Sequence, residues 1–135
     1  MTINESIERI LGRTDIVADL FYTVFLDRYP ELREFFAGVD LKRQAVLLTI
    51  ALCTVEDYYT RRYKAAELYL KYLGTKHYDL NIPRETYAMF HDAMLATLEQ
   101  FHGDEWDNAL AEQWSDALRQ ATDLMFEGYE RRYHV

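Results

Sequence analysis

Residues Leu73–Tyr87 read LGTKHYDLNIPRETY, and this stretch decides how the chain is expected to fold. Its first half has helical spacing and ends in Lys76 and His77, and Pro83 follows shortly after. Proline suits the first turn of a helix, because that amide has no intrahelical partner and the ring fixes a helical φ. We therefore expect one helix to end just past His77, a corner over residues 79–81, and a second helix from Pro83.

The remaining sequence predicts an all-helical fold. Only five glycines and two prolines occur, and no stretch alternates apolar and polar residues over the length of a strand. Capping patterns at Thr2, Thr14 and Asp40 mark helix starts. The expected helical segments run from the Thr2 cap to Gly12, from the Thr14–Asp15 cap to Tyr29, from Pro30 to Phe36, from the Asp40 cap past Tyr58, from Arg61 to Tyr78, from Pro83 to about His102, and from Asp104 onward.

Apolar residues recur at helical spacing in each of these segments, which predicts amphipathic helices around one core. The apolar share of the helix after Asp40 is expected to include Val46, Leu47, Ile50, Ala51, Val55 and Tyr58. There is no linker, repeat or low-complexity tract, so residues 1–135 are expected to form a single domain. An ordinary helical bundle and a packing of crossed helices around a pocket both fit this periodicity.

Composition narrows the classes of function. The net charge is −8 and the pI about 4.9, which argues against nucleic acid and against an anionic membrane surface as partners. Cys53 is the one cysteine, so an internal disulfide and a cysteine-rich metal site are excluded. No membrane-length apolar run and no signal peptide are apparent, and a cytoplasmic protein is expected. The chain is expected to act as a monomer or a homodimer.

A single histidine near a helix end is most often a surface or capping residue. The residues around His77 are more informative than the histidine alone. The stretch resembles the globin family, in particular bacterial single-domain haemoglobins and the haemoglobin domain of flavohaemoglobins. In that family a basic residue and a histidine carry the proximal haem ligand, and a tyrosine stands ten residues later, as Tyr87 does here. The resemblance covers about Thr14 to Met125. It implies a globin fold with haem b as cofactor and His77 as its iron ligand.

The first half of the chain carries the rest of the resemblance. Phe21-Tyr22 and the following LDRYPELREFF match a bacterial globin signature, which implies that Tyr22 lies in the distal pocket and that Phe36 stacks on the porphyrin. Taken singly, each is better read as a core aromatic of an amphipathic helix, but together with Pro30-Glu31-Leu32 the pair favours the pocket. The segment FAGVDLKRQAVLL implies that Gln44 is the distal glutamine and Leu48 an apolar gate.

The resemblance further implies that Leu73, Ile82 and Phe90 line the haem pocket with Tyr87. Two positions depart from the family pattern. Flavohaemoglobins carry a glutamate late in the last helix, where this chain has Tyr129, and a basic residue where this chain has Leu47. The first departure puts a strongly electron-donating proximal triad in doubt. The second leaves Lys42, Arg43 or Lys76 to pair with the haem propionates.

The function implied by the resemblance is reversible binding of O₂, with NO and CO as further gases. Conversion of NO to nitrate would need an external reductase. Two alternatives stay open, a globin-type gas or redox sensor that acts through a partner and a non-haem helical interaction protein. The other histidines compete poorly as ligands, because His91 lies beside Phe90, His102 is expected at a frayed helix end and His134 is in the tail.

Overall fold

The structure, a computed structural model, describes residues 1–134. These residues form six α-helices and two 3₁₀ segments, and no strand occurs among them. The elements are α1 (Ile3–Gly12), α2 (Thr14–Arg28), η1 (Pro30–Phe36), α3 (Leu41–Arg61), α4 (Lys64–Asp79), α5 (Thr86–His102), η2 (Gly103–Glu105) and α6 (Asn108–Glu130). The prediction of an all-helical fold is confirmed. None of the helices in this part of the chain has both the length and the apolar character needed to cross a membrane.

Helix α1 begins with the predicted capping box. Thr2 Oγ1 accepts a hydrogen bond from the Glu5 amide at 3.2 Å, and the Glu5 carboxylate accepts one from the Thr2 amide at 3.0 Å. The cap of α3 is also confirmed, since the Asp40 carboxylate accepts from the Lys42 amide at 3.0 Å. Helix α2 differs, because Thr14 is already its first helical residue and no side chain caps it.

Three helix starts lie later than predicted. Arg61 belongs to α3, which ends at Arg62 in a left-handed conformation with φ of 57°, so α4 begins only at Lys64. Pro83 opens a turn in which its carbonyl accepts the Thr86 amide at 3.1 Å, and α5 begins at Thr86. The last helix is capped by Asp107, whose carboxylate accepts the Leu110 amide at 2.8 Å, and not by Asp104. In each case a short non-helical or 3₁₀ segment precedes the helix.

The buried side of α3 also differs from the prediction. Leu48, Leu52 and Val55 are buried, whereas Val46, Leu47 and Ile50 are 59%, 43% and 45% exposed. Apolar residues surround almost the whole circumference of this helix, so periodicity alone permitted more than one face. The choice is made by tertiary packing, because α3 contacts α1, α2, α4 and α6, and Leu48, Leu52 and Val55 are the residues buried there.

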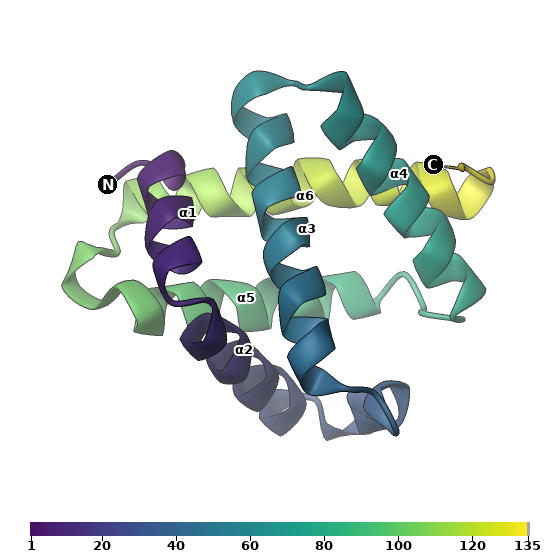
Figure 1. Cartoon of the computed structure of the whole chain (residues 1–135), viewed down its shortest axis with the longest axis horizontal. Coiled ribbons are helices and arrows are strands. Elements are labelled where there is room, and N and C mark those ends of the chain that lie inside the picture. Colours follow the sequence, from purple (N-terminus) through teal and green to yellow (C-terminus); the bar gives the residue numbers. More distant parts are fainter. Residues whose placement is uncertain (135) are drawn as a thin grey trace.

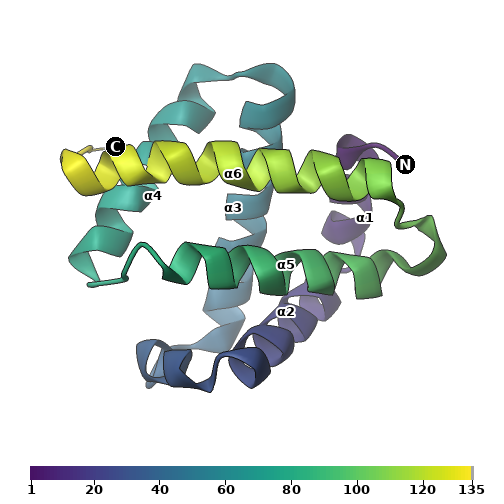
Figure 2. The same cartoon turned by 180° about the vertical axis from the view of Figure 1, so that it is seen from behind.

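Figures 1 and 2 show how the helices are arranged: α5 and α6 lie side by side, and α3 crosses them on one side of the molecule. Helix α2 packs against α5, and α4 packs against the second half of α6. This crossed arrangement gathers one core whose fully buried side chains include Phe21, Leu52, Met94 and Trp114.

Two glycines allow α4 and α6 to touch at the backbone. A Cβ on Gly74 would overlap the carbonyl oxygen of Met125, and a Cβ on Gly128 would overlap the carbonyl oxygen of Lys71. Thr75 adds a hydrogen bond from its hydroxyl to the Gly128 carbonyl at 3.0 Å. Because no side chain separates the two backbones here, the last turn of α4 is held in a fixed place on α6.

Candidate functional site

His77 lies in the last turn of α4, as predicted, and its ring is largely enclosed. Burial lowers the pKa of His77 to about 4, so the imidazole is neutral at pH 7. Its Nδ1 atom lies 2.9 Å from the hydroxyl of Tyr87. Within residues 1–134, His77 Nε2 forms no hydrogen bond. Every fully buried side-chain nitrogen or oxygen in this part of the chain does have a hydrogen-bond partner, so Nε2 is not fully buried and keeps some access to solvent.

The corner after His77 is built by backbone hydrogen bonds. The Asn81 amide donates to the Tyr78 carbonyl at 3.0 Å, and the Ile82 amide donates to the His77 carbonyl at 3.1 Å. Asn81 adopts a left-handed conformation with φ of 61°, which asparagine tolerates better than most residues. The chain reverses here and enters α5 with Tyr87 facing back toward His77, and this explains how a spacing of ten residues becomes a direct contact.

Tyr87 is 7% exposed and lies within a group of aromatic side chains. Its ring centroid is 4.9 Å from that of Phe126 and 5.8 Å from that of Tyr129, both on α6. Burial raises the pKa of Tyr87, and hydrogen bonding with Tyr129 raises it further. The Tyr87 hydroxyl therefore stays protonated beside His77.

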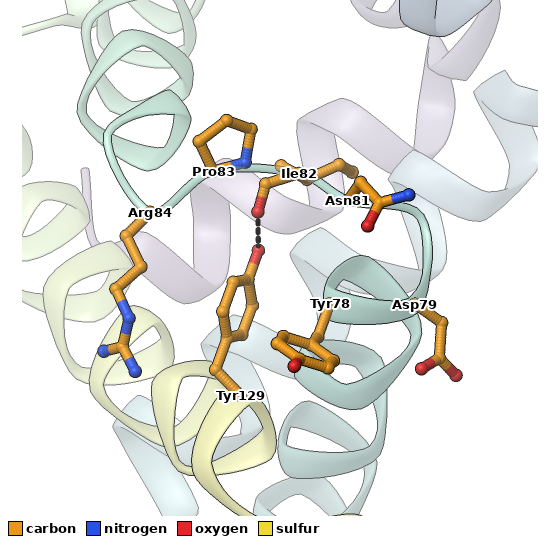
Figure 3. Close-up of a pocket in the computed structure, with 7 residues that line it drawn as sticks. All are labelled: Tyr78, Asp79, Asn81, Ile82, Pro83, Arg84 and Tyr129. Atoms are coloured by element: carbon orange, nitrogen blue, oxygen red, sulfur yellow. Dashed lines mark hydrogen bonds between the residues drawn. The ribbon is translucent and has the colours of Figure 1, made fainter.

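Sequence reasoning did not assign a role to Tyr129, although it noted the position. Figure 3 shows this side chain reaching from α6 to the corner, where its hydroxyl donates to the Ile82 carbonyl at 2.6 Å. The available signal was the helical register of α6, in which Tyr129 follows Phe126 and Met125 on the side that faces α4 and the corner.

The predicted distal residues come together at the other end of the core. Tyr22 is 8% exposed, and its ring packs edge to face on Phe36 with centroids 5.5 Å apart. Burial raises the pKa of Tyr22 to about 12, and hydrogen bonding with Gln44 partly opposes the rise. Gln44 is half-buried in the first turn of α3, and Leu48 is buried one turn later.

Leu73, Ile82 and Phe90 are half-buried and pack on the apolar core between these two groups. The Phe90 ring lies 5.1 Å from that of Phe21, which is itself 5.1 Å from that of Tyr22. Phe90 is thus linked to the distal group through aromatic contacts, and it follows Tyr87 by one helical turn on α5. Seven of the nine predicted site residues, all except His77 and Gln44, therefore belong to the hydrophobic core or pack on it, and His77 contacts that core through Tyr87.

Basic side chains near the site are exposed. Lys42 and Arg43 lie in the first turn of α3, Lys76 precedes the proximal histidine, and Leu47 is 43% exposed. Within the described residues, none of the three basic side chains forms an ion pair. They remain available to an external anionic group.

Two hollows occur on the outer side of the proximal corner. The larger, of about 510 Å³, is lined by Tyr78, Asp79, Asn81, Ile82, Pro83, Arg84 and Tyr129 and is drawn in Figure 3. The smaller, of about 220 Å³, lies between the ends of α4 and α6. Neither is lined by His77 or by the predicted distal residues.

The other histidines are engaged in structural contacts. His91 Nε2 bonds to the Thr122 hydroxyl at 2.8 Å. His102 was expected at a frayed helix end, but it is 8% exposed and its Nε2 lies 2.6 Å from the Ser6 hydroxyl. The indole of Trp114 donates to the same hydroxyl at 3.0 Å, so α1 is tied to α5 and α6 in the core. No group of three histidine, cysteine or carboxylate side chains suited to a metal ion occurs in residues 1–134.

Comparison with known proteins agrees with this architecture. A crystal structure of a protein from Pseudomonas aeruginosa PAO1, described as structurally highly homologous to a human haemoglobin, is similar with a TM-score of 0.76 and 25% sequence identity. The match covers 92% of this chain and 98% of that chain. No curated protein matches the sequence significantly. A sequence model of the globin family matches residues 19–125, which is most of the chain. The chain therefore belongs to the globin family and has the globin fold.

Proposed function

We propose that this globin binds haem b through His77 and takes up O₂ reversibly. The observation that carries the proposal is the state of His77, which is neutral, is bonded at Nδ1 by Tyr87 and has no hydrogen bond at Nε2 among the described residues. A neutral imidazole is the form that binds a metal, and a hydrogen bond at the second nitrogen fixes both the tautomer and the ring orientation.

The choice of nitrogen distinguishes His77 from its competitors. His91 and His102 each use Nε2 in a hydrogen bond to a hydroxyl, whereas His77 uses Nδ1. Nε2 is the nitrogen at the far end of the ring, and it reaches furthest from the helix backbone. His77 therefore has the donor atom that an axial ligand requires, and its half-buried apolar neighbours Leu73 and Ile82 suit a flat macrocycle.

The distal group supports a gas as the ligand. An iron porphyrin supplies the reversible binding of diatomic gases, and the chain supplies polarity around it. Tyr22, with its pKa raised to about 12, keeps its O–H at neutral pH, and Gln44 adds an amide N–H. A charge-assisted hydrogen bond from such a donor contributes roughly 1 to 3 kcal/mol in a dry site, and this favours retention of O₂.

The proposal extends to NO and CO as further ligands, on the resemblance of the sequence motifs to those of flavohaemoglobins. Conversion of NO to nitrate is proposed only with an external reductase, because the reaction consumes electrons that the side chains of this site do not carry. Lys42, Arg43 and Lys76 are proposed to meet the propionates, since their ammonium and guanidinium groups are exposed and unpaired within the described residues.

The absorption spectrum of the purified protein reconstituted with haem tests the proposal. We expect stoichiometric uptake and a Soret band that shifts on reduction with dithionite and again on addition of CO. The His77→Ala variant treated with the same haem is the control for non-specific adsorption. A visible region identical to that of this variant would contradict haem ligation by His77, and a featureless visible region would favour a non-haem interaction protein.

A further inference from the structure

Helix α3 carries an apolar stripe on the side that faces away from the core. Between residues 43 and 57, seven positions lie within about 60° of Ile50 around the helix at 3.6 residues per turn. We call them the α3 stripe: Arg43, Val46, Leu47, Ile50, Cys53, Thr54 and Asp57. The buried residues Leu48, Leu52 and Val55 lie on the opposite side of the helix.

The middle of the α3 stripe is apolar and open. Val46, Leu47 and Ile50 are neighbours there, and each is more than two-fifths exposed. Figure 1 shows α3 in front of α5 and α6, with α1 and α4 on either side. The Thr54 hydroxyl donates to the Ile50 carbonyl at 2.8 Å, so covering it would leave no unpaired donor. A contiguous apolar surface of this kind marks an interaction site more often than single exposed side chains do.

The two ends of the α3 stripe carry opposite charges. Arg43 is exposed at one end and forms no ion pair within residues 1–134. Asp57 lies at the other end with 43% of its side chain exposed, and its partner is Arg61 at 3.1 Å. The same guanidinium also pairs with Glu56 at 2.9 Å. One cation therefore serves two carboxylates, and the Asp57 end keeps an excess of negative charge.

These charges are placed symmetrically about Ile50. Arg43 precedes Ile50 by seven residues, and Asp57 follows it by seven. A twofold axis through Ile50 and perpendicular to α3 would set Arg43 of each copy opposite Asp57 of the other, and Val46 opposite Thr54. A parallel arrangement would instead set Arg43 against Arg43 and Asp57 against Asp57, which is repulsive. The α3 stripe is thus complementary to itself in one orientation, the antiparallel one.

We propose that a second copy of this chain covers the α3 stripe, in an antiparallel twofold dimer with Ile50 on the axis. The net charge of −8 makes two copies repel one another in general, but the α3 stripe offers a surface where a cation meets an anion at both ends. A contact along one helix is smaller than a standard interface of about 800 Å² per partner, so the dimer should dissociate in the micromolar range.

Sedimentation velocity of the full chain, from about 5 μM to about 0.5 mM, is the first test. We expect the wild type to pass from monomer to dimer over this range. Ile50→Glu removes the apolar centre and sets two carboxylates face to face, so it should raise the dissociation constant by roughly a hundredfold. Leu80→Glu is the matched control, because Leu80 is 64% exposed in the corner after α4, outside α3, and should leave dimerisation unchanged.

Charge reversal tests the orientation. Arg43→Asp and Asp57→Arg should each weaken the dimer about tenfold, because two symmetric ion pairs become repulsive, and the double variant should return to within about threefold of the wild type. A parallel dimer would not lose affinity in either single variant. Arg43 is also proposed to meet a haem propionate, so these variants are compared before haem is added.

Cross-linking tests the position of the axis. Helix axes 8–10 Å apart would bring the two Cα atoms of residue 50 to roughly 5 Å from one another, which is within the range of a disulfide. With a mild oxidant, Ile50→Cys in a Cys53→Ser background should form a cross-linked dimer, whereas Leu80→Cys in the same background should not.

Two results would overturn the proposal. The first is a wild-type protein that stays monomeric up to about 0.5 mM, which would leave the α3 stripe to a different kind of partner. The second is a dimer that Ile50→Glu does not weaken, which would place the interface on another face. Neither result depends on haem uptake, so the proposed function stands or falls separately.

Discussion

The two ends of the candidate site are built in different ways. On the proximal side, His77 is fixed by backbone contacts at Gly74 and Gly128, by the bonded corner and by a hydrogen bond to Tyr87. On the distal side, Tyr22 is buried, but Gln44 and Phe36 are half-buried. A metal ligand has to keep one orientation, whereas a gas-binding side has to admit its ligand. The predictions below test whether rigidity is indeed confined to the proximal side, and they run from the largest expected effect to the smallest.

The largest effect is expected for His77→Ala. Loss of the one ligand should abolish stoichiometric haem binding, or leave a five-coordinate ferrous spectrum that appears only when imidazole is added. Haem titration followed at the Soret band measures this. His91→Ala is the matched control, since His91 is half-buried and hydrogen-bonded but has no expected haem contact. Equal haem binding by the two variants would remove His77 from the site.

Next comes Gly74→Ala, which tests the crossing of α4 and α6. The added methyl group would overlap backbone atoms of Met125, and backbone cannot move aside as a side chain can. We expect a loss of about 3 kcal/mol in the free energy of unfolding, measured by urea denaturation of the apoprotein. For Gly12→Ala no atom lies within 4 Å of the new methyl group, and the change should be within about 1 kcal/mol of zero.

Acid should destabilise the apoprotein through His77. Burial lowers the pKa of the folded His77 from 6.5 to about 4, so the unfolded state binds the additional proton between these values. The free energy of unfolding should therefore be highest above pH 6.5 and fall as the pH drops toward 4, with a contribution from His77 of at most about 3 kcal/mol.

The pH dependence of urea denaturation for His77→Gln measures this contribution. The variant should flatten the curve between pH 6.5 and 4, whereas His134→Gln, in the exposed tail, should follow the wild type. Because burial also lowers the pKa values of His91 and His102, part of the acid sensitivity should remain in His77→Gln. A curve for His77→Gln with the full wild-type slope would show that His77 is not desolvated in the folded protein.

The smallest of these effects is expected on the distal side. Tyr22→Phe removes one hydroxyl donor and should speed O₂ dissociation about tenfold, which corresponds to about 1.4 kcal/mol. Stopped-flow displacement of O₂ by CO measures the rate. Tyr72→Phe is a suitable control, because Tyr72 is half-buried on α4 and its nearest aromatic contact is Tyr69. An unchanged rate in Tyr22→Phe would assign the donor role to Gln44 alone.

Much of the fold was predictable because its signals are local. The capping box at Thr2, the Asp40 cap and the end of α4 after His77 follow from side-chain chemistry within a few residues, and the structure confirms them. The starts of α4, α5 and α6 were predicted too early, because a helix-breaking residue does not reveal how many turn residues follow it. The prediction of the apolar face of α3 was wrong at Val46, Leu47 and Ile50, because tertiary contacts decide which apolar residues of a helix are buried.

In the candidate site, too, contacts between residues close in sequence were predictable and contacts between distant residues were not. The pairing of His77 with Tyr87 was implied by the resemblance to the globin family, and the structure places the two side chains 2.9 Å apart. Other contacts join segments more than 45 residues apart in sequence, namely those of Tyr129 and of the pair Gly74 and Gly128. No local sequence pattern predicts such contacts. Ligation of haem by His77 remains a prediction, as do the roles of Tyr22 and Gln44.

The glycine crossing has a mechanical consequence. Helices that meet through interdigitated side chains can slide past one another by small rotamer adjustments. At Gly74 and Gly128 no side chain lies between α4 and α6, so such adjustments are not available there. The two helices should consequently move together as one rigid body. His77, in the last turn of α4, would then move with α6 and not relative to it. Any strain created at His77 would then be transmitted first to α6, and not to the Tyr22 and Gln44 side on which gas binding is proposed.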